Sequence, residues 1–138
     1  MGLYYRIWVD CIMRLKSIDS NKTDWKFKGM TAMSIAMTFN LVLVLVILQK
    51  NVFGYFYEIN IESLSGFQNY ILTMLILYFA PIVLLNYLLI FRLNRYERLI
   101  EKYPYKNGKL VVTYILISMF LPIILLFGGI ILAKLNVI

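Results

Sequence analysis

The chain contains no histidine and a single cysteine, Cys11. Histidine is the side chain that most often serves as a general base near neutral pH and as a metal ligand, so its absence removes the usual basis for both. A lone cysteine cannot form a disulfide within the chain. The serines also lack the base that normally activates them as nucleophiles. We therefore expect no catalytic residue, no metal site and no cofactor.

Charged residues are also scarce, at 15% of the sequence. Two of the acids, Glu97 and Glu101, are one helical turn apart. They alternate with Arg98 and Lys102, a pattern typical of a solvated helix face and not of a catalytic carboxylate pair. The sequence also has no glycine-rich loop that could bind a phosphate. These observations predict that the protein is not an enzyme.

Hydrophobic residues, in contrast, make up 62% of the 138 residues. Soluble domains are about half apolar, and a small domain buries a smaller fraction of its surface than a large one. Three apolar runs without any charged residue cover about 29–48, 70–91 and 110–133. About 20 apolar residues are enough to cross the hydrocarbon layer as a helix. The sequence predicts an all-α integral membrane protein with three transmembrane helices in a single domain, residues 1–138.

The basic residues alternate between the segments that flank these runs. Six Lys and Arg precede the first run, one lies between the first and second, six lie between the second and third, and one follows. The positive-inside rule then places the N-terminus in the cytoplasm and the C-terminus outside. The abundance of Tyr, Asn, Lys and Ile is compatible with an AT-rich bacterial genome, so we expect a bacterial cytoplasmic (inner) membrane.

The net charge of +7 invites a nucleic-acid interpretation. The charges flank the apolar runs, however, and do not line one face, so we expect no nucleic-acid partner. A lipid bilayer with anionic headgroups on the cytoplasmic side is the expected partner, because juxtamembrane Lys and Arg are attracted to such headgroups.

Residues 3–18 predict a short basic amphipathic helix. Apolar side chains recur on one side and polar side chains on the other: Tyr4, Trp8, Cys11, Ile12, Leu15 and Ile18 against Arg6, Asp10, Arg14 and Ser17. Such a helix is typical of the membrane interface. The alternative is that it packs on the protein's own helices or on a partner. The expected interface anchors are aromatic: Trp8, Trp25, Tyr55 and Tyr57.

Local signals refine the second and third runs. Pro81 and Pro122 lie inside them and predict kinks, because proline cannot donate its backbone hydrogen bond. Ser65 is placed to cap the second helix. This helix should extend into the cytoplasm to about residue 103, where Pro104 disfavours further helix. Asn107-Gly108 then predicts a turn.

Polar and small residues inside the spans are candidates for helix–helix contacts. We expect Asn40 to face another helix, because an amide facing lipid is costly. The depth of Asn86 matches Ser34, Thr38, Thr113 and Tyr114, so one of these should be its partner. The same side chains could instead line a lumen. The full set of contact or lumen candidates is Ala32, Ser34, Ala36, Asn40, Asn86, Ser118, Gly129 and Ala133.

Ala32/Ala36 and Gly129/Ala133 both have the small-xxx-small spacing that lets helices approach closely. In the predicted topology the two pairs lie at different depths, so they cannot pack on each other. Each pair therefore needs the second helix or a neighbouring chain, which favours a homo-oligomer or a subunit of a larger membrane complex.

The functional hypothesis is a non-enzymatic interaction subunit, scaffold or immunity-type binder in a membrane complex. The alternative is a homo-oligomeric pore or membrane-permeabilising effector, in which Asn40, Ser34, Thr38 and Asn86 would face a shared lumen. A more distant possibility is a carrier that handles a lipid or a peptide.

Overall fold

The computed structural model describes residues 2–18, 24–49, 52, 54 and 58–134, apart from the side chains of Leu126, Leu132 and Ala133. These residues are helical or form turns and loops, with no strand among them. Three helical stretches are long and apolar enough to cross a membrane. This confirms the expected all-helical fold with three apolar spans.

The spans begin slightly earlier than expected. The first is α2 (Trp25–Leu48), the second begins with α3 (Gly66–Thr73), and the third is α6 (Lys109–Lys134). The second starts before residue 70 because Ser65 caps it, as expected: its side chain accepts a hydrogen bond from the Gln68 backbone N–H at 3.3 Å. The Gln68 side chain accepts one from the Ser65 N–H at 3.0 Å in return, which completes a capping box.

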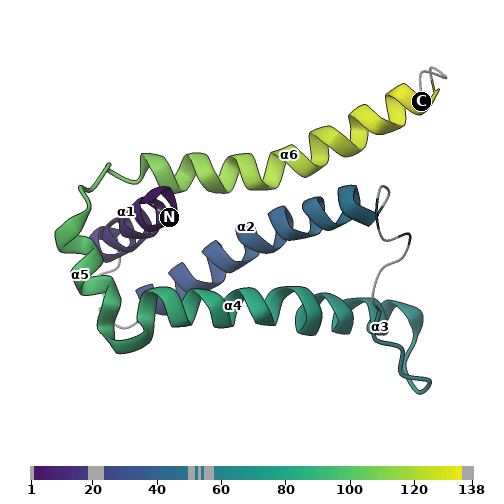
Figure 1. Cartoon of the computed structure of the whole chain (residues 1–138), viewed down its shortest axis with the longest axis horizontal. Coiled ribbons are helices and arrows are strands. Elements are labelled where there is room, and N and C mark those ends of the chain that lie inside the picture. The colour runs from purple at the N-terminus through teal and green to yellow at the C-terminus, as the bar shows by residue number, and fades with distance from the viewer. Residues whose placement is uncertain (1, 19–23, 50–51, 53, 55–57, 135–138) are drawn as a thin grey trace.

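The molecule has two distinct ends (Figure 1). One end, the α1 end, gathers α1 (Gly2–Ile18), the start of α2, α5 (Arg95–Lys102) and the start of α6. The other, the α3 end, gathers α3 and the far ends of α2 and α6. The described basic residues of α1, of the first turn of α2 and of 92–109 all belong to elements of the α1 end.

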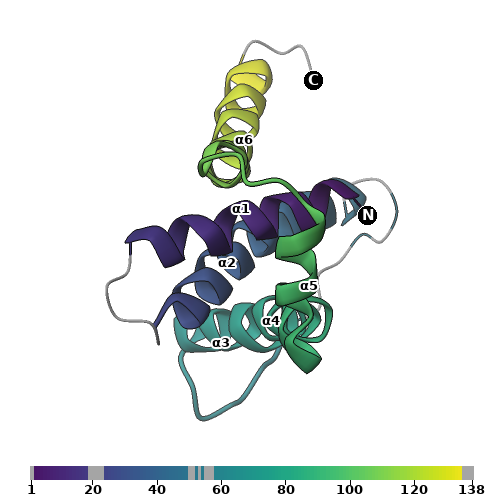
Figure 2. The same cartoon turned by 90° about the vertical axis from the view of Figure 1, so that its left-hand side faces the viewer.

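Helix α1 lies across the bundle and not along it (Figure 2). It contacts α2, α5 and α6, and its residues from Ile7 to Ile12 are all buried. The buried face of α1 is therefore packed on the protein's own helices, the alternative interpretation of the amphipathic pattern. Asp10, which the pattern placed on the polar side, is 0% exposed. The contacts that cause its burial are described below.

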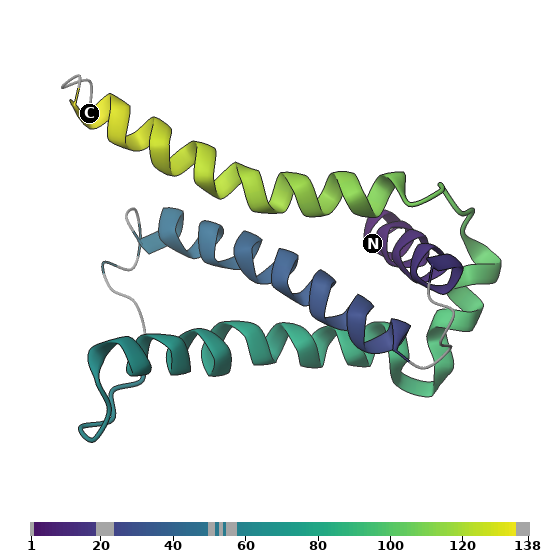
Figure 3. The ribbon, with the colours of Figure 1, turned by 180° about the vertical axis from the view of Figure 1, so that it is seen from behind.

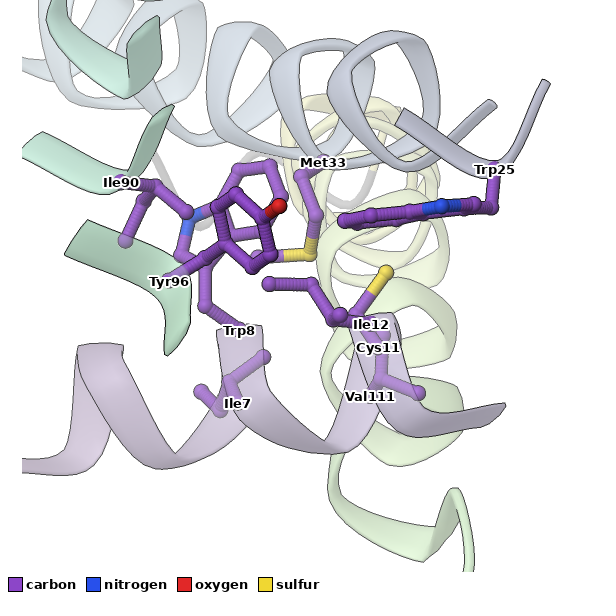
Figure 4. Packing of buried hydrophobic residues seen from close by; sticks show 9 residues of the cluster. All are labelled: Ile7, Trp8, Cys11, Ile12, Trp25, Met33, Ile90, Tyr96 and Val111. Carbon is purple, nitrogen blue, oxygen red and sulfur yellow. The ribbon is translucent and has the colours of Figure 1, made fainter. Parts of the chain in front are cut away.

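The hydrophobic core sits at the α1 end (Figure 4). Trp8, Ile12, Met33 and Ile90 are its fully buried members. The Trp8 ring meets Phe91 edge-on with centroids 5.5 Å apart. We expected Trp8 and Trp25 to anchor the chain at the membrane interface, but their side chains are only 0% and 6% exposed. They are core residues, and Tyr55 and Tyr57 lie outside the described residues.

The second span is irregular around its proline. After α3 it continues as a π-helical segment, η2 (Met74–Phe79), then α4 (Ala80–Asn86), then a second π segment, η3 (Tyr87–Phe91). The Ala80 N–H donates to the Leu75 carbonyl, five residues back. Pro81, where we expected a kink, has no N–H to donate to a helical hydrogen bond. The irregularity near it consists of wide π-helical turns directly before the proline. Helix α6 contains Pro122 and changes direction along its second half (Figure 3).

The expected straight extension of the second helix to about residue 103 is broken. The short turn η4 (Arg92–Asn94) separates it from α5, and Leu93 and Asn94 have φ of 56° and 53°. A left-handed leucine costs about 1–2 kcal/mol. The turn brings Tyr96 into the core, where it is 7% exposed and its ring centroid is 5.4 Å from that of Trp25. Burial of this aromatic side chain offsets the strain of the turn.

Candidate functional site

A buried carboxylate holds α1 against the start of α6. Asp10 Oδ1 accepts hydrogen bonds from the backbone N–H of Lys106 at 2.8 Å and of Gly108 at 3.0 Å. Its Oδ2 accepts from Leu110 at 2.9 Å and from Val111 at 3.3 Å. The first N–H groups of a helix have no partner within it, and its N-terminus favours negative charge. Asp10 therefore caps α6 from a different helix.

The expected Asn107-Gly108 turn leads into α6 and includes the Gly108 N–H that donates to Asp10. Asn107 and Gly108 have φ of 56° and 75°, and the Lys109 N–H donates to the Lys106 carbonyl at 3.2 Å. Arg14 lies over the turn and donates to the Asn107 carbonyl at 3.2 Å. A Cβ on Gly108 would overlap the Arg14 Cδ. The positive φ favours glycine here, and any larger residue would also have to displace the Arg14 side chain from the turn.

Asn86 lies at the centre of a buried polar cluster that joins three helices. Its Nδ2 donates to Ser34 Oγ at 2.9 Å, and Ser34 is one of the four partners considered from depth. Its Oδ1 accepts from the Tyr4 hydroxyl at 2.7 Å. Burial raises the pKa of Tyr4 from 10.0 to about 12, so this hydroxyl remains a donor. Both Asn86 and Ser34 are 0% exposed.

Asn40 joins α2 to α6. Its Nδ2 donates to Ser118 Oγ at 2.9 Å and to the Tyr114 hydroxyl at 3.1 Å. Ser118 is 1% exposed. Thr38, in contrast, donates to the Ser34 carbonyl of its own helix at 2.8 Å. Interhelical hydrogen bonds of this kind are worth about 0.6–2 kcal/mol each in a membrane.

The small residues of the two spans are placed differently. Ala36 is 1% exposed, and Ala32 is half-buried. A Cβ on Gly129 would meet no described atom within 4 Å. The side chain of Ala133 lies outside the described part of the chain. Of the two pairs, the described structure thus buries Ala36 of α2 and leaves the Cβ position of Gly129 of α6 open.

Cationic side chains lie over aromatic rings at the α1 end. Lys16 Nζ is 4.7 Å from the Trp25 ring centroid, and Lys26 Nζ is 5.1 Å from that of Tyr96. Arg6 and Lys102 lie over Tyr103 at 6.0 and 5.8 Å. Each such contact contributes about 0.5–1 kcal/mol at an exposed site. These contacts hold positive charge at the surface of the α1 end.

An apolar groove of ≈ 480 Å³ runs between α2 and the first part of the second span. Its walls are Ile35, Thr38, Phe39 and Val42 on one side and Tyr70, Met74, Leu75 and Phe79 on the other. A smaller hollow of ≈ 160 Å³ shares Val42, Tyr70 and Met74 with it. Sequence reasoning missed this groove, because every position of an apolar span looks alike by hydropathy.

The described side chains thus offer hydrogen bonds between helices within the chain and apolar contacts on its outer surface. Among the described residues, no group of His, Cys, Asp or Glu could hold a metal ion. Comparison of the chain with protein-family models, with curated proteins and with solved structures gave no match.

Proposed function

We propose that the chain is an integral protein of the bacterial inner membrane that works as a non-enzymatic interaction subunit, scaffold or immunity-type binder in a membrane complex. The observation that carries this proposal is where the polar and the apolar side chains of the spans lie. Asn40 bonds to Ser118 and Asn86 bonds to Ser34 within the chain, whereas many large apolar side chains of the spans are exposed.

The apolar outer faces support the proposal. Val44, Leu84 and Ile124 are 51%, 58% and 63% exposed. In a bilayer such faces are covered by lipid or by another apolar helix, and helix association there depends on close packing. Gly129, with no described atom near its Cβ position, offers one place for close approach. A second copy of this chain or another membrane subunit fits these surfaces.

The alternative of a pore is less well supported. A water-filled lumen needs polar side chains that are free on one face of the assembled helices. Ser34, Asn86 and Ser118 are 0%, 0% and 1% exposed and are bonded inside one chain. An oligomer would therefore present mostly apolar residues to its axis.

The proposed orientation has the N-terminus and the α1 end in the cytoplasm. Helix α1 would then lie at the membrane surface, and the described basic residues of the α1 end would face anionic headgroups, at about 1 kcal/mol each near the surface. The cations over Trp25, Tyr96 and Tyr103 support this, since they hold charge at that end. An impermeant maleimide applied to intact cells should label Ser63→Cys and spare Tyr105→Cys. The reverse pattern would invert the proposed orientation.

A dye-release assay separates the interaction subunit from the pore. Purified chain in dye-loaded vesicles should release no more dye than empty vesicles do, under conditions in which a pore-forming peptide empties them. Asn40→Leu should change nothing. Release by the wild-type chain that Asn40→Leu abolishes would overturn the proposal in favour of a pore.

The interaction role itself is tested in native membranes. A photoreactive residue at Ile124 should give a discrete protein adduct whose mass identifies a second copy or another subunit. The matched control is Trp8, which is 0% exposed and should give none. If photoreactive residues along all three spans gave only lipid adducts, the protein would be monomeric in the bilayer and the proposal would be wrong.

A further inference from the structure

We propose that the groove between α2 and η2 seats one acyl chain of a membrane phospholipid, in the leaflet nearest the α3 end. This inference rests on the insertion of the spans into a bilayer and does not depend on the interaction role. It assigns a lipid site to a chain whose fold otherwise suggests only helix packing.

The groove exists because the two helices that form it separate. Contacts between α2 and the second span involve α4 and η2, and α2 moves away from that span toward the α3 end (Figure 1). The far wall contains Met74, Leu75 and Phe79, all in the π-helical segment η2. Wide π turns occur frequently at functional sites. Here they place large apolar side chains along the opening.

The lining selects an apolar ligand. No charged residue contributes to the described walls. The one hydroxyl on the α2 wall, that of Thr38, already donates to the Ser34 carbonyl at 2.8 Å. A ligand with several polar groups would lose its hydration in this groove without gaining partners. A hydrocarbon chain loses nothing by entering it from the bilayer.

The size of the groove favours an acyl chain over a transmembrane helix. A hydrocarbon chain with contacts at about 4 Å that spans half of the hydrocarbon layer, about 15 Å, needs on the order of 300 Å³. The groove offers ≈ 480 Å³. A helix is about 10–12 Å wide with a pitch of about 5.4 Å, so roughly one turn would already fill that space.

Tyr70 gives the site a direction. It belongs to both the groove and the adjoining hollow, is 56% exposed, and lies in α3. The neighbouring Asn69 side chain donates to Asn60 Oδ1 at 3.1 Å and to the Ile61 carbonyl at 3.2 Å, in a polar exposed loop. Tyrosine is enriched where spans meet headgroups. The lipid headgroup would lie beside Tyr70, with its acyl chain running toward Ile35.

The first experiment fills the groove from the second span. Native mass spectrometry of the purified chain should show one retained phospholipid on the wild type. Leu75→Trp should reduce that adduct several-fold, because the larger ring occupies part of the groove and removes close van der Waals contacts between its walls and the acyl chain. Leu84→Trp is the matched control: Leu84 lies on the same span, has similar exposure (58% against 52%) and is not part of the groove. It should retain the lipid. Equal retention by both variants would overturn the proposal.

A second variant fills the groove from the opposite wall, in case Leu75→Trp fails to fold. Val42→Phe should also lose the lipid, whereas Val44→Phe, at a 51% exposed position of α2 outside the groove, should keep it. A phospholipid with a photoreactive acyl chain should label 35–42 and 70–79 more heavily than Leu84 and Ile123. Uniform labelling would indicate bulk lipid only, and a protein cross-link from Leu75→Cys in place of lipid would indicate a partner helix. Either result would refute the acyl-chain site and would leave the dye-release test of the proposed function unaffected.

Discussion

The carboxylate of Asp10 and the backbone N–H of Gly108, 98 positions apart in the chain, are joined by a hydrogen bond of 3.0 Å. Three further N–H groups converge on the same side chain, that of Lys106 before α6 and those of Leu110 and Val111 in its first turn. This arrangement makes α1 an integral part of the fold and not an appendage of it. It also fixes where the third span starts relative to α1.

Substitution of Asp10 should therefore destabilise the whole bundle. Asp10→Ala leaves the N-terminus of α6 uncapped and its N–H groups without an acceptor, so we expect a loss of about 2–4 kcal/mol. Asp10→Asn retains one acceptor oxygen and should cost less. The measurement is the free energy of unfolding in detergent, followed by circular dichroism.

Glu101→Gln is the control for loss of a negative charge, because Glu101 is exposed on α5. It should change stability by less than about 0.5 kcal/mol. If Asp10→Ala were as mild as this control, the capping role of Asp10 would be wrong.

Much of the fold could be predicted because hydropathy and turn chemistry act locally. The three spans, the Ser65 cap and the Asn107-Gly108 turn each depend on neighbouring residues. The role of Asp10 could not be predicted in this way, since its partners lie about 100 residues away. One signal was present: Asp10 is the only acid in the basic residues 2–18. A lone acid in such a helix is a candidate for a distant positive partner, here a helix N-terminus.

The bridge between Asn86 and Ser34 gives a second prediction. Asn86→Leu removes the acceptor of the Tyr4 hydroxyl and the donor to Ser34, both inside the protein, so we expect a loss of about 1–2 kcal/mol. Ser34→Ala should cost less. A double-mutant cycle of the two changes should show coupling, because the residues are in contact.

Tyr87→Phe serves as the comparison for Asn86→Leu, since Tyr87 is the next residue in the span and is 51% exposed. Its unfolding midpoint should match that of the wild type. Strictly additive effects of Asn86→Leu and Ser34→Ala would mean that the 2.9 Å contact contributes nothing.

The tryptophans show the limit of reading anchors from composition. An aromatic residue next to a span is equally suited to a headgroup layer and to a core, and only the path of α1 decides between them. Because α1 crosses the bundle, Trp8 meets Phe91 and Met33 joins the same cluster. The groove escaped prediction for the same reason: it depends on how far two helices separate, which periodicity does not encode.

Cys11 provides a pH-dependent prediction. Burial, followed by the nearby charge of Asp10, raises the pKa of its thiol from 9.0 to about 12. The folded state therefore favours the neutral thiol, and this contribution to stability is fully present below pH 9 and is lost as the pH rises toward about 12. Alkylation of folded protein at pH 8–9 should be slow, and denaturation in SDS should restore the rate of an ordinary thiol. Equal rates in both states would show that Cys11 is accessible.

The close approach of α1 and α2 at Gly29 gives the last prediction. A Cβ there would lie 3.1 Å from Leu15 Cδ1 and 3.7 Å from Cys11 Sγ, so a larger side chain must push α1 away from α2. Gly29→Leu should destabilise the protein by about 1–3 kcal/mol through overpacking and should speed the alkylation of Cys11, because the same displacement uncovers the thiol. Gly128→Leu introduces the same side chain where no described atom lies within 4 Å of the Cβ position, so it should leave both readouts unchanged or stabilise α6 slightly. A stable Gly29→Leu variant with an unreactive Cys11 would show that α1 is not held against α2 at this point.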